Sequence, residues 1–261
     1  MTIIKEKRLI DMEAKLKNNL PYNSSNIKIF CADVTNSTMD LARQFIMSLS
    51  DYHDGFVISK NQIAGRGRRG SKWVQAKEAL YFTSFFKLGE SDVVNPFALV
   101  AGLSVVDTCR KFDSRVFLKW PNDIYNSDKK KLGGILTEKI DFAGNSYLLT
   151  GIGVNFYFDT SPLDTASSLF EDPKGEDFLA KFSSHLYESL KEKWVKFSSS
   201  GFDPFKNNWL DSCIHLNSPV RLEREKDTID GICCGVLGDG SLELNVNGSV
   251  QSVHSGSLFI K

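Results

Sequence analysis

A glycine- and arginine-rich segment, Gly65 to Gly70, restricts the folds open to this chain more than any other feature of its sequence. It matches the G-x-G-x-x-G fingerprint of dinucleotide-binding folds, in which a helix opens directly after the glycines. Here Ser71-Lys72-Trp73 follows and the next predicted strand begins near Leu80, so a helix of about ten residues does not fit. A doubly wound dinucleotide-binding fold is therefore excluded.

Two interpretations of this arginine-rich segment stay open. A solvated basic turn is the ordinary one for arginines clustered between strands. However, glycine allows the backbone to approach a ligand closely, and the planar fork of arginine suits phosphate and carboxylate groups. The second interpretation is a loop that folds over an anionic ligand.

Hydrophobic periodicity predicts alternating helices and strands up to about residue 213. Ser37 followed three residues later by Asp40 resembles a capping box at the start of the first helix. Asp203, with Pro204 after it, is typical of the start of the last helix. Helices are expected at 37–49, 97–112, 177–197 and 203–213, and strands at 56–60, 80–88, 115–120, 133–140 and 147–156.

The character of the sequence changes after Pro219. Short β-rich runs are separated by turn signals at 223–227, at Gly238-Asp239-Gly240 and at Asn247-Gly248. This pattern predicts a small all-β barrel attached to an α+β domain. The expected division is an N-terminal extension at 1–25, a main domain at 26–214 and a C-terminal barrel at 215–261.

Charge and cysteine usage exclude several classes of protein. Lys+Arg and Asp+Glu both number 32, so no overall field attracts nucleic acid or an anionic membrane. No apolar run approaches the ~20 residues of a membrane helix, and the N-terminus lacks the apolar core of a signal peptide. The five cysteines are scattered and form no C-x-x-C pair, which favours reduced thiols in a cytoplasmic protein without a protein-only metal site.

A polar segment, Lys119-Trp120-Pro121-Asn122-Asp123, follows a predicted strand. Proline ends the donation of ladder hydrogen bonds, so Asn122 and Asp123 are expected on the loop just beyond. Such loops often carry chemistry. A plain Asn-Asp turn is an equally good interpretation of the segment by itself.

Two further segments combine polar residues with glycines. Lys131 ends a lysine triplet, ordinarily a solvated turn, and runs directly into an apolar strand with Gly133 and Gly134, which would hold its ammonium group beside a ligand. Gly151-Ile152-Gly153-Val154-Asn155 has glycines inside an apolar strand, which indicate close approach of a backbone or a ligand near Asn155.

These four segments, with Ser37-Thr38 at the first helix, resemble biotin–protein ligases in their order and spacing, from about Asn26 to the end of the chain. The resemblance implies an α+β fold: a mixed β-sheet flanked by helices, of the class II synthetase-like biotin/lipoate ligase type, with a small C-terminal SH3-like β-barrel. Members that repress transcription carry an additional winged helix. The segment before Asn26 is too short for one, so a catalytic-only ligase that does not bind DNA is expected.

The activity implied by the resemblance has two steps. Biotin and ATP, with Mg²⁺ on the nucleotide, form biotinyl-5'-AMP, and the biotinyl group is then transferred to a lysine of a biotin carboxyl carrier protein or domain. No membrane partner is expected. A homodimer is expected only because members of the family often form one.

The resemblance also implies site residues, carried over position by position. Met39 departs from the pattern, because the repressor-type bacterial member has Asn there, so only backbone contacts to biotin are expected from it. Asp123 either orients and deprotonates the acceptor amine or acts only through its charge. The expected biotin-binding residues are Ser37, Thr38, Met39, Gln62, Arg66, Gly67, Arg68, Lys131 and Gly134; the ATP-binding residues are Arg66, Arg68, Trp73, Asn122, Lys131 and Asn155; the catalytic residues are Lys131, Arg68 and Asp123.

Two alternative functions are kept. A lipoate or octanoate ligase or transferase shares the superfamily fold, although nothing here resembles the His-Asp element typical of that group. A nucleic-acid-binding protein would use the arginine loop, but such binding usually needs a broad basic surface. The sequence contains no P-loop, no G-x-S-x-G elbow and no H-E-x-x-H, so those enzyme classes are excluded.

Overall fold

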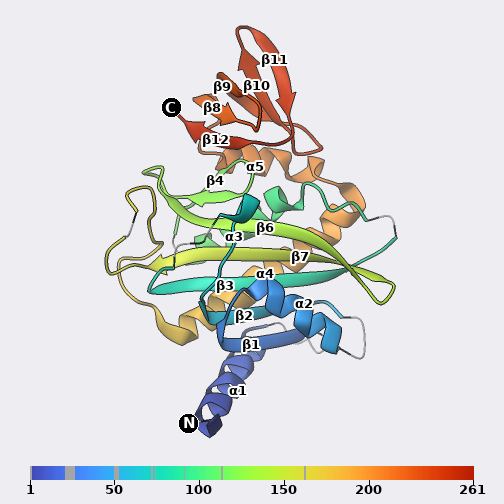
Figure 1. Ribbon diagram of the computed structural model, residues 1–261, viewed down its shortest axis with the longest axis vertical. Coiled ribbons are helices and arrows are strands. Elements are labelled where there is room, and N and C mark those ends of the chain that lie inside the picture. Colours follow the sequence, from blue (N-terminus) through green and yellow to red (C-terminus); the bar gives the residue numbers. More distant parts are fainter. Residues whose placement is uncertain are drawn as a thin grey trace.

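A computed structural model describes residues 2–20, 27–49, 53–71, 73, 75–90, 92–112, 114–161 and 163–261. The chain forms a large seven-stranded sheet covered by helices and a smaller five-stranded sheet at one end (Figure 1). The helices are α1 (Thr2–Asn19), α2 (Thr38–Ser48), α3 (Phe97–Arg110), α4 (Gly175–Ser200) and α5 (Lys206–Ser212), with 3-10 turns η1 (Arg68–Gly70) and η2 (Asp203–Phe205).

The large sheet has the strand order β1-β2-β3-β7-β6-β5-β4. Strands β1 and β2 pair in parallel, and every other pair in this sheet is antiparallel, which confirms the predicted mixed sheet. Its strands are β1 (Lys28–Thr35), β2 (Gly55–Gln62), β3 (Glu78–Leu88), β4 (Phe117–Lys119), β5 (Asp123–Tyr125), β6 (Lys131–Phe142) and β7 (Asn145–Tyr157).

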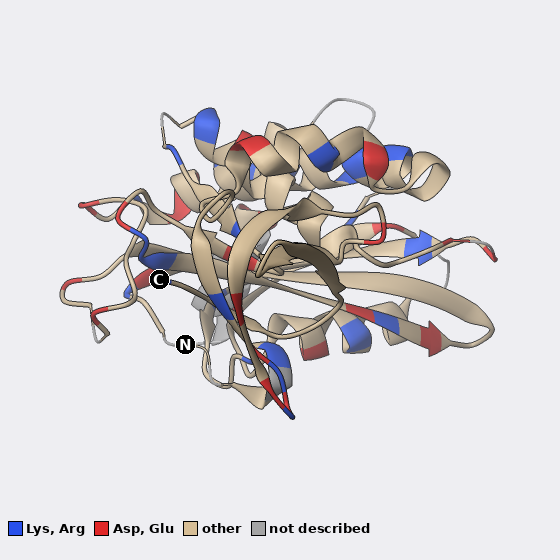
Figure 2. Cartoon of the chain, turned by 90° about the horizontal axis from the view of Figure 1, so that it is seen from above, with Lys and Arg blue, Asp and Glu red and all other residues tan. Residues whose placement is uncertain are grey.

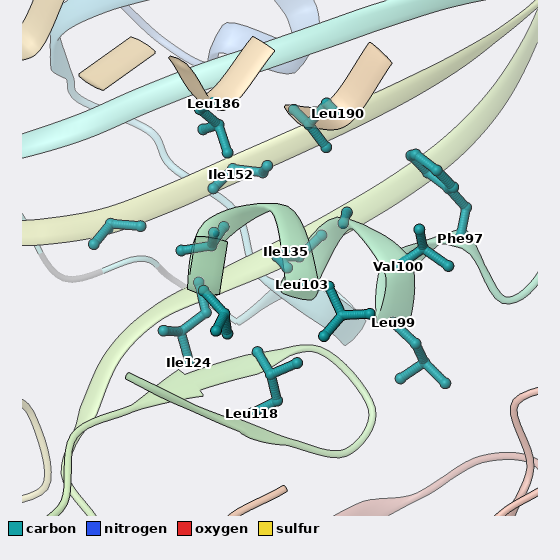
Figure 3. Close-up of a cluster of buried hydrophobic side chains, with 14 of the residues drawn as sticks. Phe97, Leu99, Val100, Leu103, Leu118, Ile124, Ile135, Ile152, Leu186 and Leu190 are labelled. Atoms are coloured by element: carbon teal, nitrogen blue, oxygen red, sulfur yellow. The ribbon is translucent and has the colours of Figure 1, made fainter. Parts of the chain in front are cut away.

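Apolar side chains cover both faces of the large sheet because alternate residues of a strand point to opposite sides. Phe56 and Ile58 of β2 face the main core with α3 and α4, whereas Val57 faces a second cluster under α2. Figure 3 shows the main core, with side chains of α3, α4 and the sheet packed together. Helix α2 therefore shares its face of the sheet with the polar residues described below.

Helix α1 was missed by the sequence analysis, which assigned no structure to residues 1–25. The helix is mostly polar and has only a short apolar stripe. Met12 and Leu16 of this stripe are buried in the main core. The Ser184 hydroxyl of α4 donates a hydrogen bond to the carbonyl of Leu16 at 3.0 Å. The helix is thus packed onto α4; residues 21–26 lie outside the described part of the chain.

Three local predictions were wrong in detail. Ser37 does occupy the N-cap of α2, but its side chain makes no capping hydrogen bond, so the predicted capping box is not formed. Asp203 is the first residue of η2 rather than a cap. Asp123 does not lie on a loop, because Trp120–Asn122 turn tightly and Lys119 already pairs with Asp123 across β4 and β5.

The C-terminal sheet is antiparallel, with the order β11-β10-β9-β8-β12. Its strands are β8 (Pro219–Glu223), β9 (Thr228–Val236), β10 (Leu242–Val246), β11 (Ser249–Val253) and β12 (Ser257–Ile260). The predicted turn at Asn247-Gly248 is confirmed, and both residues have the positive φ, 52° and 88°, of a type I′ hairpin. Among the described strands β11 and β12 remain edges, so the closed barrel stays a prediction.

We expect Leu16→Ala to lower the free energy of unfolding by roughly 2–4 kcal/mol, because a fully buried leucine is replaced by a cavity between α1 and α4. Urea denaturation followed by circular dichroism measures this. Lys17→Ala on the exposed side of the same helix is the control and should cost well under about 1 kcal/mol. Equal small effects of both changes would mean that α1 is not part of the folded core.

Candidate functional site

A cleft of about 680 Å³ lies on the face of the large sheet that α2 partly covers. Its walls come from the start of α2, the loop at 63–71, strands β4 to β7, and the start of β12 in the other sheet. All thirteen predicted site residues line it: Ser37, Thr38, Met39, Gln62, Arg66, Gly67, Arg68, Trp73, Asn122, Asp123, Lys131, Gly134 and Asn155. The structure brings them together, whereas their individual roles stay predictions.

Glycines on β7 make room for the side chains that form the wall of the cleft. A Cβ atom at Gly153 would lie 3.0 Å from the Trp73 ring, and one at Gly151 would lie 2.8 Å from the sulfur of Met39. Both distances are shorter than ordinary van der Waals contact. Trp73 and Met39 can therefore pack against β7 only because these two positions lack side chains.

A chain of neutral hydrogen bonds fixes one end of the cleft. The Gln62 Oε1 accepts hydrogen bonds from the Thr38 backbone N–H at 2.8 Å and from the Thr38 hydroxyl at 3.2 Å. The Thr83 hydroxyl in turn donates to Thr38 Oγ1 at 2.9 Å. Thr38 and Thr83 are buried, so this end is polar, uncharged and rigid.

Asp123 lies between two lysines. Its Oδ1 accepts from Lys131 Nζ at 2.6 Å, and its Oδ2 accepts from Lys119 Nζ at 3.2 Å. Burial alone would raise the pKa of Asp123, but the charges of Lys131 and Lys119 and their hydrogen bonds outweigh it and hold that pKa below the ordinary 3.8. The side chain of Lys119 is 10% exposed and that of Lys131 is 39% exposed, so Lys131 has the ammonium group that is more open to a ligand.

The arginine loop is attached on both sides of the cleft. Arg66 Nη2 donates to Asp40 Oδ1 of α2 at 2.6 Å. On the opposite side, Arg68 Nη1 lies 3.4 Å from Asn122 Oδ1 and 3.5 Å from the Gly256 carbonyl beside β12. The loop therefore spans the cleft from helix α2 to the residues beside β12.

Three buried polar atoms on the cleft wall have no hydrogen-bond partner among the residues that the structure describes: Trp73 Nε1, the Tyr81 hydroxyl and Asn155 Oδ1. A buried polar group without a partner costs roughly 1–3 kcal/mol. Burial raises the pKa of Tyr81 to about 12, so its hydroxyl stays protonated at neutral pH and remains a donor. Two donors and one acceptor are thus available to a polar ligand.

Of the lysine triplet, only Lys131 lines the cleft; Lys129 and Lys130 are exposed. The backbone explains this selection, since Lys131 N–H donates to the Thr165 carbonyl at 2.8 Å as β6 begins. That bond also brings Leu163 and Thr165 to the cleft, which no sequence signal indicated.

Other residues that line the cleft were not predicted from the sequence either. Lys119 stood inside a recognised segment without an assigned role, and Tyr81 belonged to a strand that was expected only to be buried. Gly256 to Phe259 carry no motif and reach the cleft only through packing of the two sheets. The described residues contain no group of three or more His, Cys, Asp or Glu side chains placed to hold a metal ion, and none of their helices is long and apolar enough to cross a membrane.

Residues 31–155 match the model of the "Biotin/lipoate A/B protein ligase family". Among curated proteins, the chain is 28% identical over 211 residues to the bifunctional ligase/repressor BirA of Escherichia coli and 25% identical over 236 residues to the biotin–[acetyl-CoA-carboxylase] ligase of Paracoccus denitrificans. These matches cover 78% and 86% of this chain and 65% and 97% of the two relatives. The chain thus spans just under two thirds of the length of the Escherichia coli protein.

A solved structure with the same fold is the biotin protein ligase from Aquifex aeolicus in complex with biotin and ATP. The TM-score is 0.74 at 24% identity, and the match covers 90% of this chain and 99% of that one. The likeness shows that the mixed α+β arrangement is that of biotin protein ligase structures.

We expect Asp123→Asn to lower the free energy of unfolding by roughly 2–3 kcal/mol at pH 7. This is somewhat less than the cost of removing one partner of a fully buried ion pair. Because the pKa of Asp123 is depressed, its carboxylate stabilises the fold above about pH 4, and that contribution is lost as the pH falls through the folded-state pKa. The gap to wild type should therefore shrink in urea titrations at pH 3. A gap of equal size at both pH values would contradict the ion-pair explanation; exposed Asp128→Asn is the control.

Proposed function

We propose that this chain is a member of the biotin/lipoate A/B protein ligase family and that it is a biotin–protein ligase. It activates biotin with ATP as biotinyl-5'-AMP and transfers the biotinyl group to a lysine of a biotin carboxyl carrier protein or domain. The proposal rests on one observation: the cleft has an uncharged polar end and, next to it, a cationic end.

The uncharged end suits the ureido ring of biotin, which is neutral and needs paired donors and acceptors beside an apolar wall. Gln62 uses its carbonyl oxygen on Thr38, which leaves its NH₂ group as a donor. Ser37 and Thr38 supply buried hydroxyls, and Met39 against Gly151 supplies apolar surface. In this proposal Gly67 and Gly134 let the valeryl chain lie close to the backbone.

The cationic end suits the first chemical step. A carboxylate oxygen of biotin attacks the α-phosphorus of ATP, and the bond to pyrophosphate breaks. Two anions must approach each other, so Lys131, Arg66 and Arg68 offset their repulsion, together with the Mg²⁺ that enters as part of the MgATP substrate. Arg68 and Lys131 are the groups we assign to the developing charge on the phosphate.

The unpartnered wall atoms suit the nucleotide. Asn155 Oδ1 is a buried acceptor, and Trp73 Nε1 is a buried donor on an indole that lines the cleft. Asn122 holds its own loop by donating to the Ile135 carbonyl at 2.7 Å, and its Oδ1 lies next to Arg68. We assign these three residues to ATP.

In the second step the neutral amine of the carrier lysine attacks the carbonyl carbon of the adenylate, and AMP leaves. The depressed pKa of Asp123 makes its carboxylate a weak base, since two ammonium groups already stabilise the charged form. This supports a role in attracting and orienting the incoming ammonium group over a role as the proton acceptor.

The C-terminal sheet takes the place of the SH3-like barrel in this proposal, with the division at 26–214 and 215–261 expected from the sequence. Gly256 to Phe259 would form the rim nearest the nucleotide. We place the reaction in the cytoplasm, in keeping with the scattered free cysteines.

The alternatives receive less support. The Paracoccus denitrificans relative and the Aquifex aeolicus structure are named as ligases of biotin, and none of the proteins reported above is named for lipoate or octanoate. For nucleic acid, Figure 2 shows lysines and arginines interspersed with aspartates and glutamates in the view from above, instead of gathered into one basic stripe. Arg66 moreover pairs with Asp40, which lowers its availability to an extended phosphate backbone.

We expect the purified protein to exchange labelled pyrophosphate into ATP in a biotin-dependent manner, without any carrier. Adenylate formation is reversible, so the label enters ATP only if the mixed anhydride forms. Parallel reactions with lipoate and octanoate are the control. A lipoate- or octanoate-dependent signal without a biotin-dependent one would transfer the protein to the other branch of the family.

We expect Lys131→Ala to slow adenylation by roughly two to three orders of magnitude, because a charge-assisted contact to the reacting phosphate contributes about 2–4 kcal/mol to transition-state stabilisation. The exchange assay measures this, with circular dichroism as a check on folding. Exposed Lys130→Ala is the matched control and should leave the rate unchanged. An equal loss in both variants would contradict the assignment of Lys131.

A further inference from the structure

Asp40 holds two arginines with one oxygen. Its Oδ1 accepts from Arg43 Nη1 of the same helix at 2.6 Å and from Arg66 Nη2 of the loop, also at 2.6 Å. Arg43 in turn pairs with Glu138 on β6 through its other nitrogen. Four charges of alternating sign therefore connect β6, α2 and the arginine loop.

Neither capping nor ligand contact accounts for Asp40. The sequence suggested that it belonged to a capping box, but the Ser37 side chain makes no capping bond, and the carboxylate of Asp40 is bound to arginines. Arg66 lines the cleft, whereas Asp40 does not. The guanidinium of Arg66 thus reaches from the cleft wall to an anchor outside it.

This anchor matters because Arg66 lies between Gly65 and Gly67, whose backbones are the least restricted of any residue type. A guanidinium has five N–H donors in a planar fork. Asp40 occupies one edge of that fork through Nη2, and the remaining donors can bind an anion in the cleft. We propose that Asp40 is a positioning residue: it holds Arg66, and with it the loop, in the orientation that binds the anionic part of the ligand.

The expected size of the effect follows from exposure. The side chains of Asp40 and Arg66 are 37% and 47% exposed, so their ion pair is screened by solvent. Exposed pairs of this kind change an equilibrium by roughly two- to fivefold. The loop should therefore become more mobile without Asp40, while the fold stays intact.

Trypsin tests the position of the loop without any ligand, because it cleaves after the arginines and Lys72 of this segment. We expect Asp40→Asn to increase the cleavage rate within residues 66–72 by roughly two- to fivefold at low salt, and the difference to wild type to shrink in 1 M salt, where charges are screened. Glu138→Gln is the matched control: it removes the other partner of Arg43 but leaves the Asp40–Arg66 pair, and should cleave as wild type does. An unchanged rate in Asp40→Asn, or an equal increase in Glu138→Gln, would overturn the inference.

Kinetics provide the second readout, which rests on the proposed function. In Asp40→Asn the KM for biotin and the release rate of the adenylate should rise by roughly two- to fivefold, with kcat for adenylation unchanged at saturation. Asp40→Glu keeps the charge and should restore most of the KM. A fall in kcat alone would overturn the positioning role. If wild type forms no adenylate, the proposed function fails, and the trypsin comparison alone decides whether Asp40 positions the loop.

Discussion

The cleft depends on what β6 and β7 leave out. A Cβ at Gly133 would lie 2.5 Å from the Gly153 carbonyl, and Cβ atoms at Gly151 and Gly153 would collide with Met39 and Trp73. The backbones of β6 and β7 are therefore close-packed, and Met39 and Trp73 fill the space that side chains of β7 would otherwise occupy. These two side chains form the wall of the cleft in their observed positions only because β7 lacks side chains there.

Positive charge is concentrated locally in a chain whose lysines and arginines equal its acids in number. Lys119, Lys131 and Arg68 all face the cleft, and Asp123 neutralises only part of their charge. Asp123 keeps the two lysines close together despite their mutual repulsion, and its own burial is tolerated because both oxygens are engaged. A site for anions is thus compatible with a neutral surface elsewhere.

Periodicity predicted the elements that are long and strongly patterned, such as α2, α4, β3 and β7. It missed α1, whose apolar stripe is narrow, and the edge strand β1, whose burial does not alternate regularly. It also missed β5, whose three residues are too few for any pattern. The site residues could be placed in one site because their motifs resemble those of biotin–protein ligases in order and spacing, position by position. Leu163, Thr165 and Gly256 to Phe259 could not, because they reach the cleft through tertiary contacts that leave no local signal.

The loop is attached through Arg66 and through Arg68, and a ligand in the cleft would affect these two attachments differently. Arg66 is held by Asp40 from outside the cleft, so an anion inside can add contacts without breaking that pair. Arg68 touches Asn122 and Gly256 with long hydrogen bonds of 3.4 and 3.5 Å inside the cleft, where a phosphate would compete for the same guanidinium. In the proposed function an anionic ligand would therefore compete with these two long contacts at Arg68, while the Asp40–Arg66 pair outside the cleft can persist.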